Sequence, residues 1–164
     1  MSKCGKIPVI MQMEATECGA ASLAMVLAYY GLRLPLEQVR EDCGISRDGS
    51  KLSYIAKAAM KYGMEVHIYK YSVQAVQEKV EYPAIIHWNF NHFVVLQGFE
   101  KGYAYLNDPA RGRVKVTMRE FDRAYTGIVL CMKPTEKFVP GGKPDSVWKF
   151  AMDRLHGDIG AIAL

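Results

Sequence analysis

A single cysteine stands where a polar segment gives way to a long apolar helical pattern. The stretch QMEATECGAASLAMVLAYYG runs from Gln12 to Gly31, and its cysteine is Cys18. Unpaired backbone N–H groups at the start of a helix stabilise a thiolate, which is the nucleophilic form of cysteine. Taken alone, a cysteine at a helix start is more often a packing residue than a nucleophile. The position therefore permits a reactive thiol without establishing one.

Two further residues could activate that thiol if a hairpin brings them together. The segments HFVVLQGF (92–99) and YAYLND (103–108) are predicted to pair, so that facing positions have numbers adding up to about 202. His92 then meets Asp108, within a residue or two, at one end of the sheet. A carboxylate beside an imidazole fixes its tautomer and stabilises the imidazolium. Each residue also has an ordinary interpretation, His92 as a surface histidine and Asp108 as a turn residue.

An amide side chain six residues before the cysteine completes this chemistry. Attack of a thiolate on a peptide carbonyl creates an oxyanion that needs hydrogen-bond donors. The backbone N–H of Cys18 and the side chain of Gln12 are the available pair, and glutamine donates without titrating. Amide donor, cysteine at a helix start, histidine and aspartate are the parts of a papain-like cysteine protease. We therefore predict Cys18 as the nucleophile, with His92 as its base and Asp108 orienting the imidazole.

The elements that must position these residues are predicted to be helices first and strands second. Apolar residues spaced by three and four predict a helix from Glu17 to Tyr30, capped by Thr16 and ended by Gly31. The other predicted helices cover 35–43, 51–62, 72–80 and 118–125, and the predicted strands cover 65–71, 83–88, 92–99, 103–108, 112–117 and 127–133. This order predicts an α+β fold in which an N-terminal helical layer packs on a mostly antiparallel C-terminal β-sheet. Together with the papain-like set of catalytic residues above, we expect a papain-like cysteine protease fold.

The composition argues against several other classes of protein. The formal net charge of +4 comes from 21 basic and 17 acidic residues. They are scattered along the chain, which argues against nucleic acid as the partner. No run of about 18 apolar residues and no secretory signal is present, so we expect a cytosolic setting with reduced thiols. The 4 cysteines never form a CxxC pair, so we expect no metal site. His67, His87 and His156 are interpreted as ordinary structural or surface residues.

A change of composition after Lys133 marks a predicted domain edge. Residues 1–133 are predicted to form the peptidase domain, and residues 134–164 a Pro/Gly linker followed by an amphipathic segment. The sequence stops at Leu164 while it is still apolar. We therefore expect a longer protein in which this segment leads toward a transmembrane domain.

Three motifs resemble a known family. The segment MQMEATECGAASLAMVLAYYG, the strand start NHFVV and the turn NDPARG are similar to the peptidase C39 family of bacteriocin-processing cysteine peptidases. The resemblance covers about residues 7 to 133, and it implies the same roles for Cys18, His92, Asp108 and Gln12. It also implies cleavage of a leader peptide after a double-glycine motif. The motif around the cysteine is most similar to transporters that serve lanthipeptide-type precursors.

The resemblance also implies partners and a location. Members of the family are N-terminal cytosolic domains of ABC transporters. The expected partners are a precursor peptide with a double-glycine leader and the transmembrane and ATPase domains of the same full-length protein. The full-length protein is expected to be a homodimer, with the peptidase domain at the cytoplasmic face of the membrane. The fragment itself is expected to be soluble. The peptidase step is expected to need no cofactor, because ATP is used by a separate domain.

Substrate contacts are the least specific part of the prediction. Leaders are usually amphipathic helices, so a shallow apolar groove is expected. The candidate substrate-binding residues are Tyr54, Ile55, Ala58, Trp88 and Asn91, and the same residues could instead be core. Two alternative functions remain, a non-catalytic C39-like leader-binding module and another papain-like acyl transferase. The presence of Cys18 argues against the first, and the flanking motifs argue against the second.

Overall fold

The computed structural model describes residues 7–44 and 51–142, so the predicted amphipathic segment and His156 lie outside the described residues. A short 3-10 turn, Ala15–Glu17, precedes the first helix. The helices are α1 (Cys18–Tyr29), α2 (Leu36–Cys43), α3 (Leu52–Lys61), α4 (Val73–Lys79) and α5 (Met118–Ala124). The strands are β1 (Met64–Lys70), β2 (Ala84–Trp88), β3 (His92–Glu100), β4 (Tyr103–Asp108), β5 (Gly112–Thr117) and β6 (Tyr125–Pro134). Every predicted helix and strand is therefore confirmed, with ends shifted by a few residues at most.

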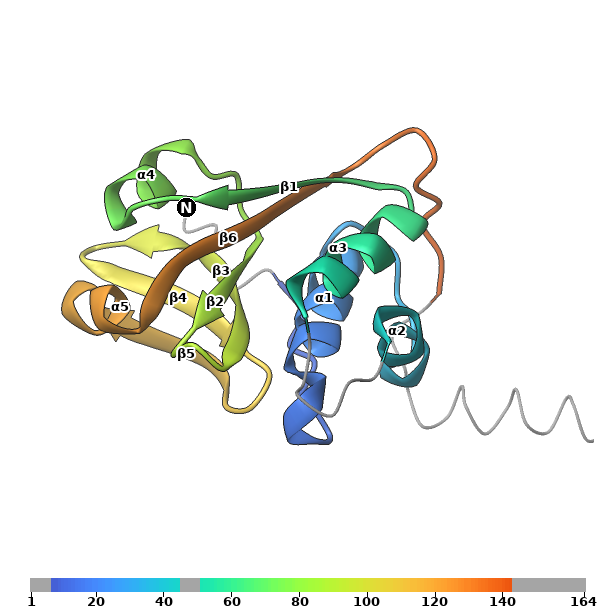
Figure 1. Cartoon of the computed structure of the whole chain (residues 1–164), viewed down its shortest axis with the longest axis horizontal. Helices are drawn as coiled ribbons and strands as arrows, with labels where there is room; N and C mark the ends of the chain where they lie inside the picture. Colours follow the sequence, from blue (N-terminus) through green and yellow to red (C-terminus); the bar gives the residue numbers. More distant parts are fainter. Residues whose placement is uncertain (1–6, 45–50, 143–164) are drawn as a thin grey trace, which may run out of the picture.

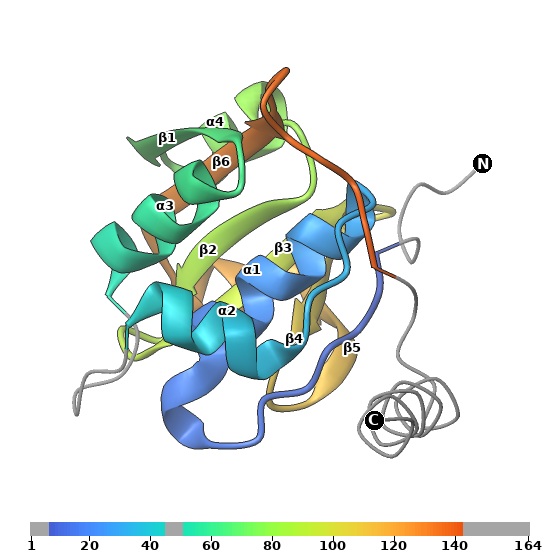
Figure 2. The same ribbon diagram turned by 90° about the vertical axis from the view of Figure 1, so that its right-hand side faces the viewer.

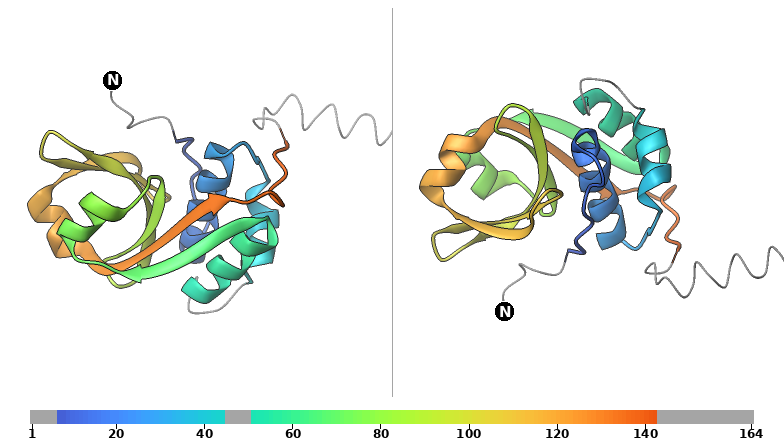
Figure 3. Two further views of the ribbon diagram at one scale, coloured as in Figure 1. Left: turned by 90° about the horizontal axis from the view of Figure 1, so that it is seen from above. Right: turned by 90° about the horizontal axis from the view of Figure 1, so that it is seen from below.

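The strands form one antiparallel sheet in the order β1-β6-β2-β3-β4-β5. Helices α1, α2 and α3 gather at one end of the molecule, and α4 and α5 lie at the other end (Figure 1). Seen from above and below, the sheet curls at the end that carries α4 and α5, while β1 and β6 extend toward the three-helix end (Figure 3). The predicted α+β fold, with a helical layer on an antiparallel sheet, is confirmed.

Helix α1 is the central element of the helical layer (Figure 2). Its residues from Cys18 to Ala28 are all buried, because α2 and α3 cover one side and β3 the other. The helix ends at Tyr29, and Gly31 follows its cap residue with a φ of 104°, a left-handed conformation that suits glycine. The predicted cap by Thr16 is wrong, since the 3-10 turn intervenes and Glu17 is the residue that precedes the helix.

Two apolar clusters lie on opposite faces of the sheet. One contains α1, α2 and α3 with strand residues such as Ile85 and Val95. The other lies within the curl of the sheet and contains Ile86, Val94 and Phe121 from α5. Adjacent residues of one strand thus enter different clusters, as expected for side chains that alternate across a sheet. The sheet is therefore buried on both faces where β2 and β3 pair.

Residues beyond β6 contact the helical layer. The backbone N–H of Thr135 donates to the carbonyl of Gly63 over 3.0 Å, and Gly141 forms a parallel bridge with Leu32. The side chain of Phe138 packs on the helical cluster. The domain edge predicted after Lys133 stays a prediction, and the segment 135–142, although mostly exposed, keeps these contacts with the helical layer. None of the described helices is both long and apolar enough to cross a bilayer.

Candidate active site

Cys18 lies in the first turn of α1, where the helical layer meets strand β3 (Figure 1). Its side chain is buried, with 4% of its surface exposed. Burial raises the pKa of the thiol, but hydrogen bonds from the His92 imidazole and the backbone amides of Phe93 and Gly19 hold that pKa below its ordinary value. The Gly19 amide is one of the free N–H groups of the helix start. The site therefore favours the thiolate.

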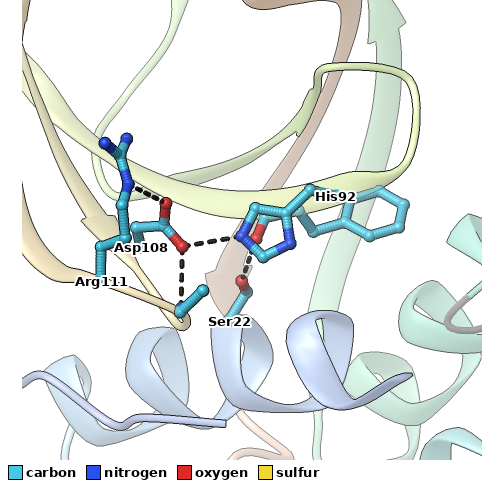
Figure 4. A network of polar contacts seen from close by, with 6 residues as sticks. Ser22, His92, Asp108 and Arg111 are labelled. Atoms are coloured by element: carbon cyan, nitrogen blue, oxygen red, sulfur yellow. Dashed lines mark hydrogen bonds and ion pairs between the residues drawn. The ribbon is translucent and has the colours of Figure 1, made fainter. Parts of the chain in front are cut away.

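His92 and Asp108 meet across the β3–β4 pair, as the sequence predicted. His92 Nε2 lies 2.7 Å from Asp108 Oδ1, and the two side chains are 18% and 4% exposed (Figure 4). The pairing of Leu96 with Leu106 follows the predicted register, and a bulge shifts it by one residue between Leu96 and Gly98. Because Nε2 is bonded to the carboxylate, the other ring nitrogen is the one left to face the Cys18 thiol.

The electrostatics of this pair favour a charged imidazole. The Asp108 carboxylate, and then the Cys18 thiol, raise the pKa of His92 from 6.5 to about 9. Burial alone would raise the pKa of Asp108, but its hydrogen bonds with His92, the Ala110 amide and Arg111 lower it to about 2. Asp108 is therefore ionised across the physiological range, and it stabilises the imidazolium.

Asp108 is itself held by the turn that follows it. The Ala110 amide donates to Asp108 Oδ1 over 2.8 Å, and Arg111 Nε donates to Oδ2 over 3.1 Å. Figure 4 shows Arg111 on the side of the carboxylate away from His92. These bonds orient the carboxylate toward the imidazole. Sequence reasoning did not single out Arg111, although its place three residues after Asp108 in a turn is a usable signal.

The peptide of Phe93 connects β3 to helix α1. Its backbone amide helps to lower the pKa of the Cys18 thiol, and its carbonyl accepts from Ser22 Oγ at 3.3 Å (Figure 4). Ser22 is completely buried and lies one turn after Cys18 on α1. The contact fixes the helix that carries the thiol against the strand that carries the imidazole. Ser22 was also missed from sequence, because its role depends on a strand 71 residues away.

Gln12 lies in the segment that leads into the 3-10 turn. Its backbone N–H donates to the carbonyl of Pro109 over 2.9 Å, so the segment is attached to the turn after Asp108. The side chain is partly buried, and its Oε1 atom is buried with no hydrogen-bond partner among the described residues. Gln12 is thus tied to the same turn as the carboxylate. Its use as an oxyanion donor stays a prediction.

The predicted substrate-contact residues divide into two groups by burial. Ile55, Ala58 and Trp88 have at most 4% of their surface exposed and pack in the two apolar clusters. A leader peptide cannot touch them in this conformation, so their burial favours the core role that the sequence also allowed. Tyr54 and Asn91 are exposed. They remain candidates, and Asn91 directly precedes His92.

The other two described histidines have polar partners different from those of His92, although His87 pairs with Phe93 across the β2–β3 ladder. His87 Nδ1 lies 2.9 Å from Thr126 Oγ1, and burial lowers the pKa of its imidazole. His67 is 53% exposed and lies 3.6 Å from Glu65. Within residues 7–44 and 51–142, no three His, Cys, Asp or Glu side chains are grouped so that they could hold a metal ion.

A helical layer against an antiparallel sheet, with a buried thiol beside an imidazole at their junction, defines the papain-like cysteine peptidases. Within that class, residues 6–137 match the Peptidase C39 family. The chain belongs to this family. It is 35% identical, over 82% of its length, to a probable microcin-H47 secretion/processing ATP-binding protein of Escherichia coli. It is 31% identical, over 80% of its length, to the lactococcin-G-processing and transport ATP-binding protein of Lactococcus lactis. The chain spans only about a fifth of the length of these curated relatives.

Solved structures agree with the fold. A double glycine motif protease from an AMS/PCAT transporter, crystallised with its leader peptide, is 61% identical. It superposes with a TM-score of 0.79, covering 82% of this chain and 96% of that one. The peptidase domain of Streptococcus ComA, a bi-functional ABC transporter involved in quorum sensing, is 24% identical with a TM-score of 0.73, covering 77% of this chain and 98% of that one. At that identity, the second likeness shows the fold alone.

Proposed function

We propose that this chain is the leader peptidase part of a peptide exporter, with Cys18 as nucleophile and His92 as acid and base. The observation that carries the proposal is the His92–Asp108 pair, 2.7 Å apart, beside a buried Cys18 whose pKa the imidazole lowers. The thiolate attacks the carbonyl carbon of the scissile peptide bond, and the imidazolium gives its proton to the leaving amine. The imidazole then takes a proton from water, which hydrolyses the thioester and restores the thiolate.

Each tetrahedral intermediate in this sequence carries a negative oxygen. The backbone N–H of Cys18 and the side-chain amide of Gln12 are the proposed donors for that oxygen. The position of Gln12, on a segment bonded to Pro109, supports this assignment because it places the segment beside the Asp108 turn. A donor used only in the transition state should affect kcat and leave substrate affinity nearly intact.

The proposed substrate is a ribosomally made precursor peptide, such as a bacteriocin or lanthipeptide, cut after a double-glycine motif. The 61% identical protein is named as a double glycine motif protease and holds a leader peptide, and the relatives are named as secretion/processing proteins. Two glycines before the scissile bond suit a cleft too narrow for side chains. The proposed partners are transmembrane and ATPase domains of the same protein, which would act as a homodimer at the cytoplasmic face of the membrane, with ATP used outside the peptidase step.

The test is cleavage of a panel of double-glycine leader peptides, with products identified by mass. The native chain should cut after the second small residue, and Cys18→Ala should bind the peptides without cutting them. Gln12→Ala should lower kcat by about 10²–10³ and leave KM nearly unchanged. Binding without cleavage by the native chain would favour a non-catalytic leader-binding module. Transfer of the acyl group to an added amine in place of hydrolysis would favour an acyl transferase.

A further inference from the structure

A buried carboxylate lies directly before the cysteine. Glu17 is the last residue of the 3-10 turn, and only 2% of its surface is exposed. A carboxylate removed from water is unfavourable unless hydrogen bonds and an opposite charge compensate it. A buried negative charge next in sequence to Cys18 would also oppose formation of the thiolate. The contacts of Glu17 must therefore explain why the charge is kept there.

Both carboxylate oxygens of Glu17 have partners from different parts of the chain. Oε2 accepts from the backbone N–H groups of Met13 and Glu14, over 2.7 and 3.1 Å. Oε1 accepts from Arg40 Nη1 of helix α2 over 2.7 Å. The guanidinium neutralises the charge, and its side chain is 33% exposed. The carboxylate thus joins the segment that follows Gln12 to helix α2.

These bonds hold the segment from Gln12 to Cys18 at both of its ends. At the first end, the Gln12 N–H donates to the carbonyl of Pro109, beside the Asp108 turn. At the second end, the Glu17 carboxylate binds the two amides that come directly after Gln12. The backbone of the proposed oxyanion donor therefore lies between two fixed points. One is set by the sheet, and the other by helix α2.

We propose that Glu17, neutralised by Arg40, is a positioning residue that fixes the Gln12 segment relative to the Cys18 amide and so assembles the oxyanion site. The inference rests on the proposed function, because it presumes that Gln12 serves the oxyanion. The Glu17→Gln variant keeps the size of the side chain. It replaces one carboxylate oxygen by an N–H₂ group, although the two backbone amides and the guanidinium all donate hydrogen bonds to this side chain. At least one buried donor would lose its partner. The segment would then shift, while the thiol and imidazole stay on α1 and β3.

The test compares Glu17→Gln and Arg40→Met with the native chain on a double-glycine leader peptide. We expect Glu17→Gln to lower kcat by about tenfold or more, because a misplacement near 1 Å can cost about 10² in rate. KM, and the rate of Cys18 alkylation by iodoacetamide, should stay within about twofold, because alkylation develops no oxyanion. The matched control is Lys61→Met, which breaks the exposed 2.7 Å ion pair with Asp42 elsewhere in the helical layer and should leave kcat unchanged.

Arg40→Met gives an independent result if Glu17→Gln does not fold, because it leaves the carboxylate in place and alters only its compensation. Arg40→Met should also lower kcat, and it should slow Cys18 alkylation as well, because the uncompensated carboxylate opposes the thiolate. Amide hydrogen exchange at Met13 and Glu14 should accelerate in both variants, and this readout does not require cleavage. Native kcat in Glu17→Gln, or a parallel loss of alkylation and cleavage in that variant, would overturn the positioning role. Absence of cleavage by the native chain would instead overturn the proposed function. In that case, unchanged amide hydrogen exchange at Met13 and Glu14 in both variants would overturn the positioning role separately.

Discussion

Replacing Asp108 by asparagine removes the carboxylate that stabilises the charged imidazole. Asp108 Oδ1 lies 2.7 Å from His92 Nε2, and both side chains are largely buried. The pKa of His92 is about 9 instead of 6.5, with the Asp108 bond as the largest cause and the Cys18 thiol as the next. That difference corresponds to about 3 kcal/mol in favour of the imidazolium, at about 1.4 kcal/mol for each pH unit. Asparagine can keep the hydrogen bond but not the charge.

The predicted effect is a shift of the alkaline limit of activity. A raised pKa means that His92 keeps its proton to higher pH and loses it as the pH rises through about 9. The competent thiolate–imidazolium form therefore lies between the lowered pKa of Cys18 and this value. In Asp108→Asn, we expect the alkaline limb of kcat/KM to move down by about 1–2 pH units, because the Cys18 contribution remains.

The assay is the pH dependence of kcat/KM for leader-peptide cleavage, followed alongside the rate of thiol alkylation. The matched control is Arg111→Gln, which removes the bond to Asp108 Oδ2 from a side chain that is 57% exposed. The guanidinium is exposed to solvent, which screens its charge, and the Ala110 amide still binds Asp108 Oδ1, so the alkaline limb should stay close to that of the native chain. A folded Asp108→Asn protein with an alkaline limb still near the native one would refute the electrostatic role given to Asp108.

Two further predictions concern the cysteines and a close backbone contact. Near neutral pH, iodoacetamide should label Cys18 before Cys43 and Cys131, because burial raises the pKa of Cys43 to about 12 and of Cys131 to about 11. Labelling is followed by mass spectrometry, and equal labelling of the three cysteines would contradict an activated Cys18 thiol. Gly63→Ala should lower the free energy of unfolding in urea by about 2 kcal/mol or more, since its φ is 92° and an added Cβ would lie 2.6 Å from the Phe138 backbone nitrogen. An unchanged midpoint would show that the backbone of Phe138 does not approach Gly63 this closely.

The sequence pattern of each segment was enough to predict the helices and strands, but not the order of the strands in the sheet. The helices and strands were predictable because their apolar periods and glycine stops are local signals. The sheet order was not, because β6 inserts between β1 and β2 through contacts between distant parts of the chain. The Thr16 cap failed for a related reason, since the Glu17 carboxylate binds the Glu14 amide and supports a 3-10 turn before the helix.

The site was predictable where its chemistry depends on residue type and hairpin geometry. Cys18, His92 and Asp108 fall in that class, and the structure brings them together. Ser22 and Glu17 do not, because a serine in a helix and a glutamate before it are ordinary in sequence. Their importance comes from Phe93 and from Arg40, which only the fold places beside them.

Strand β6 also determines how the site can move. Its residues Leu130 and Met132 belong to the helical cluster, whereas Val129 belongs to the cluster within the curl of the sheet. Along its length β6 pairs with β1 on one side and β2 on the other. The helical layer that carries the thiol therefore packs directly on the sheet that carries the imidazole, with β6 contributing side chains to the same cluster. Moving the helical layer away from the sheet would expose the β6 side chains Leu130 and Met132 together with their apolar partners on the helices, so such a movement would be opposed by the hydrophobic effect.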